Sequence, residues 1–263
     1  MLLTIDIGNT HVALGLFDGH TLLHHWRLGT HRQDTSDETS ATLRSLFELA
    51  GVSLGQVESS IIACVVPPLL PIFERTCEKI VGREPVVVGP GVRTGMALRV
   101  DNPREVGADR IVNSVAACEL VGGGPAIAVD FGTATSFDCI SEDGAFVGGA
   151  IFPGVLVSLE ALVARASRLS SVEIVRPPSA IGRNTTHNLQ SGMLFGYAGM
   201  VDTLIGRLRK ELGGRAPVVA TGGLANLIAL EAQTIERVEP FLPLEGVRMI
   251  YERRLAAHSG RPD

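Results

Sequence analysis

One pattern occurs twice in this chain and constrains its fold more than any other feature. An apolar run carries a single aspartate near its end, and an apolar residue, a glycine and hydroxylated residues follow. The first copy spans residues 2–10 with Asp6, and the second spans residues 125–136 with Asp130. Each copy continues into a further apolar, β-branched segment, as the two strands of a hairpin do. Because the copies lie close to half the chain apart, the sequence predicts two similar α/β halves facing each other across a cleft.

The turn after the first aspartate has the composition of a phosphate-binding site. A carboxylate is costly to bury in an apolar run unless something pairs with it, and Asp6 stands where the strand ends and the chain turns at Gly8. Asn9 and Thr10 offer side-chain donors, and the backbone N–H groups of such a turn point into a concavity. These groups suit a polyphosphate with magnesium, the carboxylate binding the metal or its waters. For a single copy, an ordinary hairpin with a solvated aspartate is the alternative.

A third element of the same kind occurs late in the chain. Residues 217–225 contain a short apolar run that is followed by Thr221, Gly222 and Gly223. A helical pattern begins after these glycines. Glycines there permit close approach of the backbone to a ligand, and the following helix offers its N-terminus. A simple strand-to-helix turn is the alternative.

Composition narrows the class of protein. A chain of 263 residues with 45% hydrophobic residues is long enough for two modest cores. A net charge of −5 without a Lys/Arg stripe argues against a nucleic-acid-binding surface. No apolar run approaches the roughly 18 residues of a membrane span, and the opening strand with Asp6 is unlike a signal peptide, so we expect a cytoplasmic protein without a membrane partner. The four cysteines lack metal-ligand spacing and predict buried free thiols.

Taken together, five motifs resemble those of the type III pantothenate kinases, members of the acetate and sugar kinase/Hsp70/actin superfamily. The motifs are Asp6–Thr10, Asp101–Pro103, Gly107–Arg110, Asp130–Thr135 and Gly148–Gly154. The resemblance runs in order from Met1 to about Arg254. It implies two RNase H-like domains facing each other across a nucleotide cleft, at residues 1–113 and 114–263.

The resemblance also implies a reaction, the ATP-dependent phosphorylation of pantothenate to 4′-phosphopantothenate, which is the first step of coenzyme A biosynthesis. The ATP-binding residues that it implies are Asp6, Ile7, Gly8, Asn9, Thr10, His11, Val12, Ala13, Thr133, Gly222 and Gly223. It further implies magnesium, potassium or ammonium, and a homodimer with the acceptor site near its interface. Feedback inhibition by coenzyme A is not expected.

Two metal roles follow from the same resemblance. Asp130 is expected to bind the monovalent cation, and Asp6 is expected to bind Mg²⁺ through water. From the residues alone, Asp130 could equally be a second magnesium-water acid equivalent to Asp6.

The candidate base is Asp109, which stands just before the helical pattern of residues 111–120. The alternative role for Asp109 is structural, because an acid in the first turn of a helix interacts favourably with the helix dipole. A kinase acting on an alcohol needs a carboxylate within reach of the attacking hydroxyl, and the resemblance places that base at Asp109. It also implies pantothenate binding by Gly107, Ala108, Asp109, Arg110 and Thr185. The Arg110 fork suits the carboxylate of pantothenate, whereas a helix N-cap is the alternative for Thr185.

One position departs from the family pattern, which carries tyrosine before Asp-Asn-Pro where this chain has Val100. Any acceptor contact made by that tyrosine is absent here. Two rival functions remain open: a kinase of the same fold for another small alcohol or sugar, and a non-catalytic regulator that binds a ligand or DNA partner. Asp6, Asp109 and Asp130 together favour a catalyst.

Between these motifs the chain predicts alternating strands and helices. In the first half we expect the order β-β-β-α-β-α-β, with a strand at residues 57–66 and a turn at residues 89–91. Near the end we expect a strand finishing at residues 240–242, a last helix at 244–251 and a frayed tail from Arg253.

Overall fold

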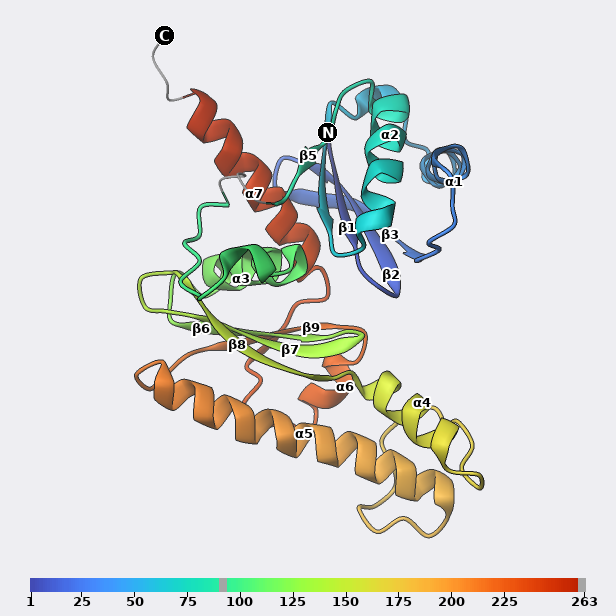
Figure 1. Ribbon diagram of the computed structural model, residues 1–263, viewed down its shortest axis with the longest axis vertical. Coiled ribbons are helices and arrows are strands. Elements are labelled where there is room, and N and C mark those ends of the chain that lie inside the picture. Colours follow the sequence, from blue (N-terminus) through green and yellow to red (C-terminus); the bar gives the residue numbers. More distant parts are fainter. Residues whose placement is uncertain (90–93, 260–263) are drawn as a thin grey trace. The chain divides into compact units, whose positions relative to one another are not determined.

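A computed structural model describes residues 1–89 and 94–259, and their contacts group the chain into two compact units (Figure 1). Unit 1 comprises Met1–Met96, Asn102–Ala116 and Pro243–Asp263, and unit 2 comprises Ala97–Asp101 and Ala117–Leu242. The chain therefore passes between the units more than once. The predicted boundary between residues 113 and 114 stays a prediction.

The centre of unit 1 is a five-stranded mixed sheet with the strand order β3-β2-β1-β4-β5. Its strands are β1 (Leu2–Ile7), β2 (His11–Asp18), β3 (Thr21–Gly29), β4 (Ser59–Cys64) and β5 (Val86–Val87). The central strand β1 runs antiparallel to β2 and parallel to β4. The predicted order of elements is confirmed, although β4 is shorter than the predicted strand at residues 57–66.

Helices α1 (Ser36–Leu49) and α2 (Leu70–Val81) lie on one side of this sheet, and α7 (Leu242–Ser259) lies on the other (Figure 1). Alternate residues of β1 and β2 face α1 and α2 and form a buried core with Phe47 and Phe73. The opposite face receives α7, whose Leu244 packs where Gly15 leaves space. The sheet of unit 1 is thus covered by one helix pair and by the last helix of the chain.

Helix α3 (Ala108–Leu120) begins in unit 1 and meets α7 there. At Gly246 of α7, a Cβ atom would overlap the backbone carbonyl of Val112 of α3. Glycine therefore permits the two helix backbones to touch. This contact fixes α7 against the helix that carries Asp109.

Unit 2 repeats this arrangement with the strand order β10-β9-β6-β7-β8. Its strands are β6 (Ala126–Phe131), β7 (Ala134–Ile140), β8 (Phe146–Pro153), β9 (Val218–Gly222) and β10 (Arg237–Val238). The central strand β6 runs antiparallel to β7 and parallel to β9, as β1 does to β2 and β4. The predicted internal repeat is confirmed, and the fold is α/β with two mixed five-stranded sheets.

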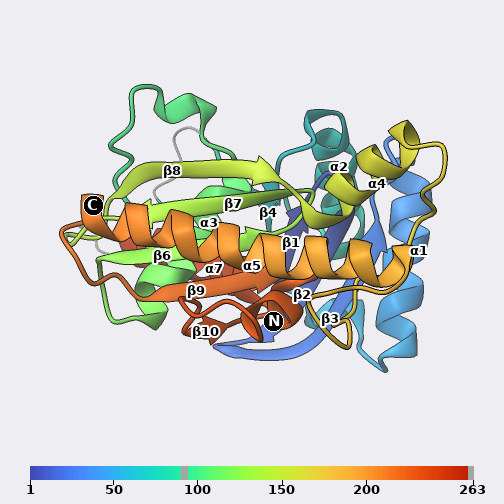
Figure 2. The ribbon, with the colours of Figure 1, turned by 90° about the horizontal axis from the view of Figure 1, so that it is seen from below.

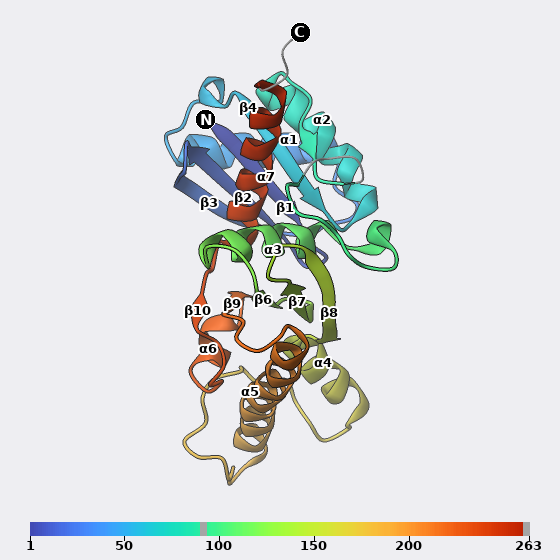
Figure 3. The same cartoon turned by 90° about the vertical axis from the view of Figure 1, so that its left-hand side faces the viewer.

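In unit 2, α4 (Val155–Arg165), α5 (Thr185–Glu211) and α6 (Ala225–Ala229) lie on one side of the sheet (Figure 3). The 27-residue α5 runs along the sheet (Figure 2) and buries Leu194, Val201 and Ile205 against it. Short 3-10 helices at Leu54–Gln56, Pro67–Leu69 and Pro103–Glu105 complete the described elements. No helix in the described ranges is long and apolar enough to cross a membrane.

Two local predictions near the C-terminus are wrong. The strand expected to finish at residues 240–242 is β10 (Arg237–Val238), and α7 already begins at Leu242. Helix α7 also continues through the expected frayed tail to Ser259. At the start of that tail, Arg253 Nη1 donates a hydrogen bond to Thr94 O at 3.2 Å. The rest of that tail, residues 260–263, and most of the turn predicted at residues 89–91 lie outside the described residues.

Candidate active site

The first Asp-Gly turn (Asp6–Ala13) lies where the central strand of unit 1 ends and β2 begins. Asp6 is the penultimate residue of β1 and pairs with Ala13 of β2 and Ala63 of β4. Gly8 N donates a hydrogen bond to His11 O at 3.0 Å and closes the hairpin. All eight predicted residues from Asp6 to Ala13 therefore belong to one hairpin.

The chain after β3 holds this turn from outside. Thr30 N donates to Thr10 O at 3.0 Å, and Thr30 Oγ1 donates to Gly8 O at 2.7 Å. These two bonds occupy backbone carbonyls on both sides of Asn9. The turn is consequently fixed by hydrogen bonds from a segment that the sequence prediction did not include.

Two arginines also contact side chains of the turn. Arg27 Nη2 lies 2.8 Å from His11 Nδ1, and Arg32 Nη2 lies 3.4 Å from Asn9 Oδ1. Burial lowers the pKa of His11, and the positive charge of Arg27 lowers it further. The imidazole of His11 is thus favoured in its neutral form, with Nδ1 accepting a hydrogen bond from Arg27.

The predicted acceptor motif, Gly107 to Arg110, lies at the start of α3. Asp109 stands in the first turn, and its Oδ1 accepts a hydrogen bond from Arg110 N at 2.8 Å. Burial raises the pKa of Asp109 above its ordinary value, although Arg110 opposes the shift. A Cβ at Gly107 would overlap Asp109 Oδ1, so glycine leaves room for the carboxylate. A carboxylate with a raised pKa is a stronger general base.

Val65 brings the acceptor motif and the first Asp-Gly turn to the same end of the unit 1 sheet. Its N–H donates to Ile7 O at 3.0 Å. Its Cγ1 lies 3.5 Å from the position that a Cβ of Gly107 would take. The structure therefore gathers two predicted groups of site residues within unit 1.

The second Asp-Gly turn (Asp130–Thr133) stands at the equivalent place in unit 2. Asp130 is the penultimate residue of β6, and Gly132 N donates to Ala134 O at 3.0 Å. Gly154 N donates to Thr133 O at 3.0 Å, and a Cβ at Gly154 would overlap the carbonyls of Gly132 and Thr133. Backbone groups therefore hold this turn.

Gly222 lies directly beside Asp130. Its φ of +97° is in the left-handed region, and a Cβ there would come within 2.6 Å of Phe131 N and 2.7 Å of Asp130 Oδ1. Its neighbour Thr221 pairs with Asp130 across the parallel strands, so their side chains share one face of the sheet. Thr221 Oγ1 is buried and has no hydrogen-bond partner among the described residues.

The remaining predicted residues of unit 2 lie on other elements. Gly223 is exposed in the turn before α6, which forms little more than one helical turn. Thr185 is the exposed first residue of α5. The N-cap is Asn184, whose Oδ1 accepts from His187 N at 2.8 Å, so the alternative role of Thr185 as the N-cap is wrong. Val100 lies against Gly148, where a Cβ would be 3.9 Å from Val100 Cγ1.

Sequence reasoning missed Thr30, Arg27 and Arg32. They follow the hairpin and belong to no motif that it recognised. A signal was nevertheless present, because residues 6–13 contain no Lys or Arg. If a polyphosphate site contains no Lys or Arg, cationic side chains from another part of the chain are expected beside it.

The chain is similar in sequence and in fold to known proteins. The family model described as type III pantothenate kinase matches residues 2–207. The type III pantothenate kinase of Moorella thermoacetica is 53% identical over 96% of this chain and 99% of its own length, and that of Geobacter sulfurreducens is 50% identical with the same coverage. The ROK hexokinase of Thermus thermophilus superposes with a TM-score of 0.54 at 16% identity, over 98% of this chain and 99% of the hexokinase. This likeness shows that the chain and the hexokinase share one fold.

Proposed function

Because the chain belongs to the type III pantothenate kinase family and phosphorylates pantothenate with ATP in the first step of coenzyme A biosynthesis, we propose that Asp109 is the base of this reaction. The observation that carries the proposal is a half-buried carboxylate of raised pKa at the start of α3. It lies at the same end of the unit 1 sheet as the first Asp-Gly turn. An exposed acid serving only the helix dipole would not show a pKa raised by burial.

In the proposed reaction, Asp109 accepts the proton of the primary hydroxyl of pantothenate. The hydroxyl oxygen forms a bond to the γ-phosphorus as the bond to the β,γ-bridging oxygen breaks, and ADP leaves. Little covalent chemistry is asked of the protein, so positioning and charge neutralisation carry the catalysis. Gly107, Ala108 and Arg110 bind pantothenate beside the base, with the Arg110 guanidinium on its carboxylate.

ATP is bound in this proposal by both Asp-Gly turns. The hairpin from Asp6 to Ala13 binds the phosphates through its backbone N–H groups and the side chains of Asn9 and Thr10. Thr133 contacts ATP from the second turn, and Gly222 and Gly223 lie near the nucleoside. Gly222 has a positive φ, which only glycine adopts readily.

Magnesium fits the donor set at Asp6. Its cross-strand neighbours on both sides, Ala13 and Ala63, put no bulky side chain beside the carboxylate. Mg²⁺ keeps several waters and is bound by one or two carboxylates together with substrate phosphates. When bound, it neutralises phosphate charge. Asp6 would bind this ion through water.

A monovalent cation fits Asp130. The paired Thr221 contributes a buried hydroxyl oxygen that has no protein hydrogen-bond partner in the described ranges. A hard cation takes carboxylate and neutral oxygen ligands, and burying such a hydroxyl without a partner is costly. Potassium or ammonium bound at Asp130 would be a partner for the Thr221 hydroxyl oxygen.

A homodimer is supported by the outer face of α5. Glycine recurs there with helical spacing at Gly192, Gly196, Gly199 and Gly206. Apart from the adjacent backbone of α5 itself, no described atom lies within 4 Å of the position that a Cβ would take at any of them. Each glycine in a helix costs about 1 kcal/mol relative to alanine. A second copy of the chain could pack its backbone closely on this face only where the side chains are small. Close packing in a dimer would therefore explain the four glycines.

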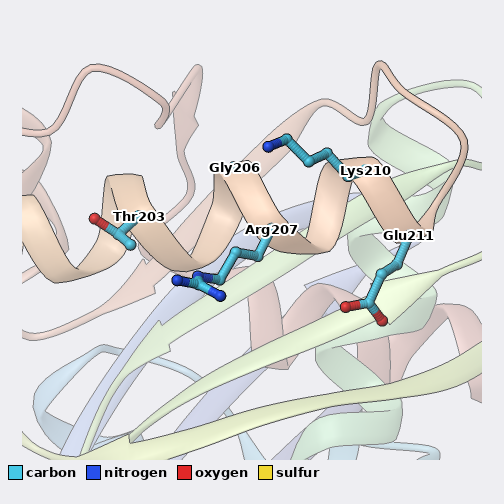
Figure 4. Close-up of a pocket in the computed structure, with 5 residues that line it drawn as sticks. All are labelled: Thr203, Gly206, Arg207, Lys210 and Glu211. Atoms are coloured by element: carbon cyan, nitrogen blue, oxygen red, sulfur yellow. The ribbon is translucent and has the colours of Figure 1, made fainter.

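The same face continues in an open hollow lined by Thr203, Gly206, Arg207, Lys210 and Glu211, all from α5 (Figure 4). Thr185 stands at the start of this helix, so a dimer through α5 would place the predicted acceptor threonine near the interface. Gly199→Leu tests the dimer. Analytical ultracentrifugation is expected to show monomers for this variant and dimers for the wild type, and dimers in both contradict the assignment.

The base is tested by a coupled ADP-release assay with pantothenate, ATP, Mg²⁺ and K⁺. We expect Asp109→Asn to lose pantothenate-dependent turnover by orders of magnitude while its affinity for ATP is unchanged. A variant that retains turnover would refute the assignment of the base. A panel of small alcohols and sugars tests the rival kinase function. The predicted cytoplasmic location stays a prediction.

A further inference from the structure

The first Asp-Gly turn carries the wrong charge for its proposed ligand. Residues 6–13 contain no Lys or Arg, and their one carboxylate, Asp6, repels a polyphosphate. Phosphoryl-transfer sites place cationic groups against the phosphates, and a single magnesium ion neutralises only part of the charge. Cationic side chains are therefore expected beside the turn, from another part of the chain.

Two arginines of unit 1 occupy that place. Arg27 Nη2 lies 2.8 Å from His11 Nδ1, and Arg32 Nη2 lies 3.4 Å from Asn9 Oδ1. They therefore contact side chains on both sides of Thr10. Thr30, which stands between the arginines in the sequence, fixes their segment to the turn by two further hydrogen bonds.

Strand register puts Arg27 on the same face of the sheet as Asp6. Asp6 is paired with Ala13, and Ala13 is paired with Arg27, so the three residues form one row across β1, β2 and β3. Neighbouring strands lie about 4.8 Å apart, which separates the outer two Cα atoms by roughly 10 Å. Since alanine is the residue between them, the carboxylate and the guanidinium flank the turn without a bulky side chain intervening.

We propose that Arg27 and Arg32 bind the phosphates of ATP and form the cationic side of the site at the first Asp-Gly turn. The inference deepens the proposed function, because it rests on ATP binding at residues 6–13. The guanidinium fork matches phosphate oxygens in a way that an ammonium group does not. Both side chains are exposed at the turn, so a ligand can reach them.

Arg27 also positions His11. A guanidinium only donates hydrogen bonds, so Nδ1 of His11 accepts and the proton of the neutral ring lies on Nε2. That leaves an N–H donor for a phosphate oxygen. The lowered pKa of His11, caused by burial and by Arg27, supports this neutral form.

The test measures equilibrium affinity for Mg·ATP and for adenosine by calorimetry in the wild type, Arg27→Ala and Arg32→Ala. Arg44→Ala, which removes an exposed arginine of α1 in the same unit, is the matched control. We expect each test variant to bind Mg·ATP roughly tenfold or more weakly, as loss of a hydrogen bond to a charged group implies. Affinity for adenosine, which has no phosphate, is expected to stay at the control value.

A merely structural role is distinguished by two further measurements. Arg27→Lys keeps the charge without the fork, so its affinity for Mg·ATP should lie between those of the wild type and Arg27→Ala. The affinity of the wild type should also fall more steeply with added salt than that of the alanine variants. Equal losses for Mg·ATP and adenosine, accompanied by a lower unfolding temperature, would overturn the inference.

The remaining outcomes separate this inference from the proposed function. Alanine variants that bind Mg·ATP as the control does, or that raise only the KM for pantothenate, overturn the inference and leave Asp109 as the base. If the arginine variants bind Mg·ATP more weakly while Asp109→Asn stays fully active, the inference about the arginines is supported. The assignment of Asp109 as the base is then refuted.

Discussion

The two Asp-Gly turns stand at the same place in two sheets of the same topology, yet they are held in different ways. In unit 1, Thr30 donates to two carbonyls of the turn, and two arginines contact its side chains. In unit 2, Gly154 and Gly222 let neighbouring backbone touch the turn directly. A duplicated strand-turn-strand element therefore keeps the position of its aspartate while its surroundings change.

This difference fits the separate roles proposed above for the two turns. The first turn is surrounded by donors and cationic side chains, which suit an anion. The second turn presents Asp130 beside the buried hydroxyl of Thr221, which suits a cation. Equivalent carboxylates can therefore acquire different roles through the residues that pack around them.

The largest expected effect comes from exchanging the two aspartates for asparagine. Asp6→Asn and Asp130→Asn should each lower kcat/KM by roughly 10²–10³, the usual loss on removing one electrostatic group of an active site. Only Asp130→Asn should abolish the dependence of the rate on potassium or ammonium. Steady-state kinetics at varied concentrations of Mg²⁺ and of the monovalent cation test this prediction. If both variants respond to the two ions in the same way, the two aspartates do not have separate roles.

Gly222→Ala should have the next largest effect. The positive φ and the backbone of Phe131 leave no space for a Cβ, so unfolding free energy should fall by about 2–3 kcal/mol. Gly55→Ala is the control, because Gly55 has no positive φ and, among the described residues, a Cβ there would meet only Ser53 Oγ, at 3.7 Å. Urea denaturation measures both variants. Equal stabilities would contradict the close packing seen at the second turn.

Thr30→Val tests the hydrogen bonds that support the first Asp-Gly turn. It removes the hydrogen bond from Thr30 Oγ1 to Gly8 O and keeps the one from Thr30 N. We expect a loss of about 1 kcal/mol in unfolding free energy, together with a higher KM for ATP. Thr21→Val, at the exposed start of β3, the strand that Thr30 follows, is the control. An unchanged KM for ATP would mean that the first turn needs no support from this loop.

The smallest effect concerns pH. Burial raises the folded-state pKa of Asp109 above 3.8, so ionising this group disfavours the folded state once the pH rises through that pKa. Asp109→Asn should therefore be as stable as the wild type below pH 3.8 and slightly more stable at neutral pH. The kcat/KM of the wild type should likewise fall, as the pH is lowered, at a pKa above 3.8. Denaturation and rate profiles between pH 3 and 8 test both statements.

The sequence predicted what depends on local pattern. Alternating apolar residues and the Asp-x-Gly repeat define both central hairpins and place Asp6 and Asp130 at strand ends. It did not predict Thr30, Arg27 or Arg32, because their contacts with the turn depend on how β3 and its loop fold back. The strand expected to finish at residues 240–242 was wrong, because α7 already begins at Leu242, with Pro243 in its first turn.

That last helix determines the order in which the protein can be completed. Unit 1 includes α7, and Gly246 fits against Val112 only after α7 has been made. Unit 2 is complete by Leu242. On the ribosome, where domains generally fold as they emerge, the second unit can close around its core before the first. The strand with Asp6 is made early, but its sheet remains uncovered on one face until α7 has been synthesised.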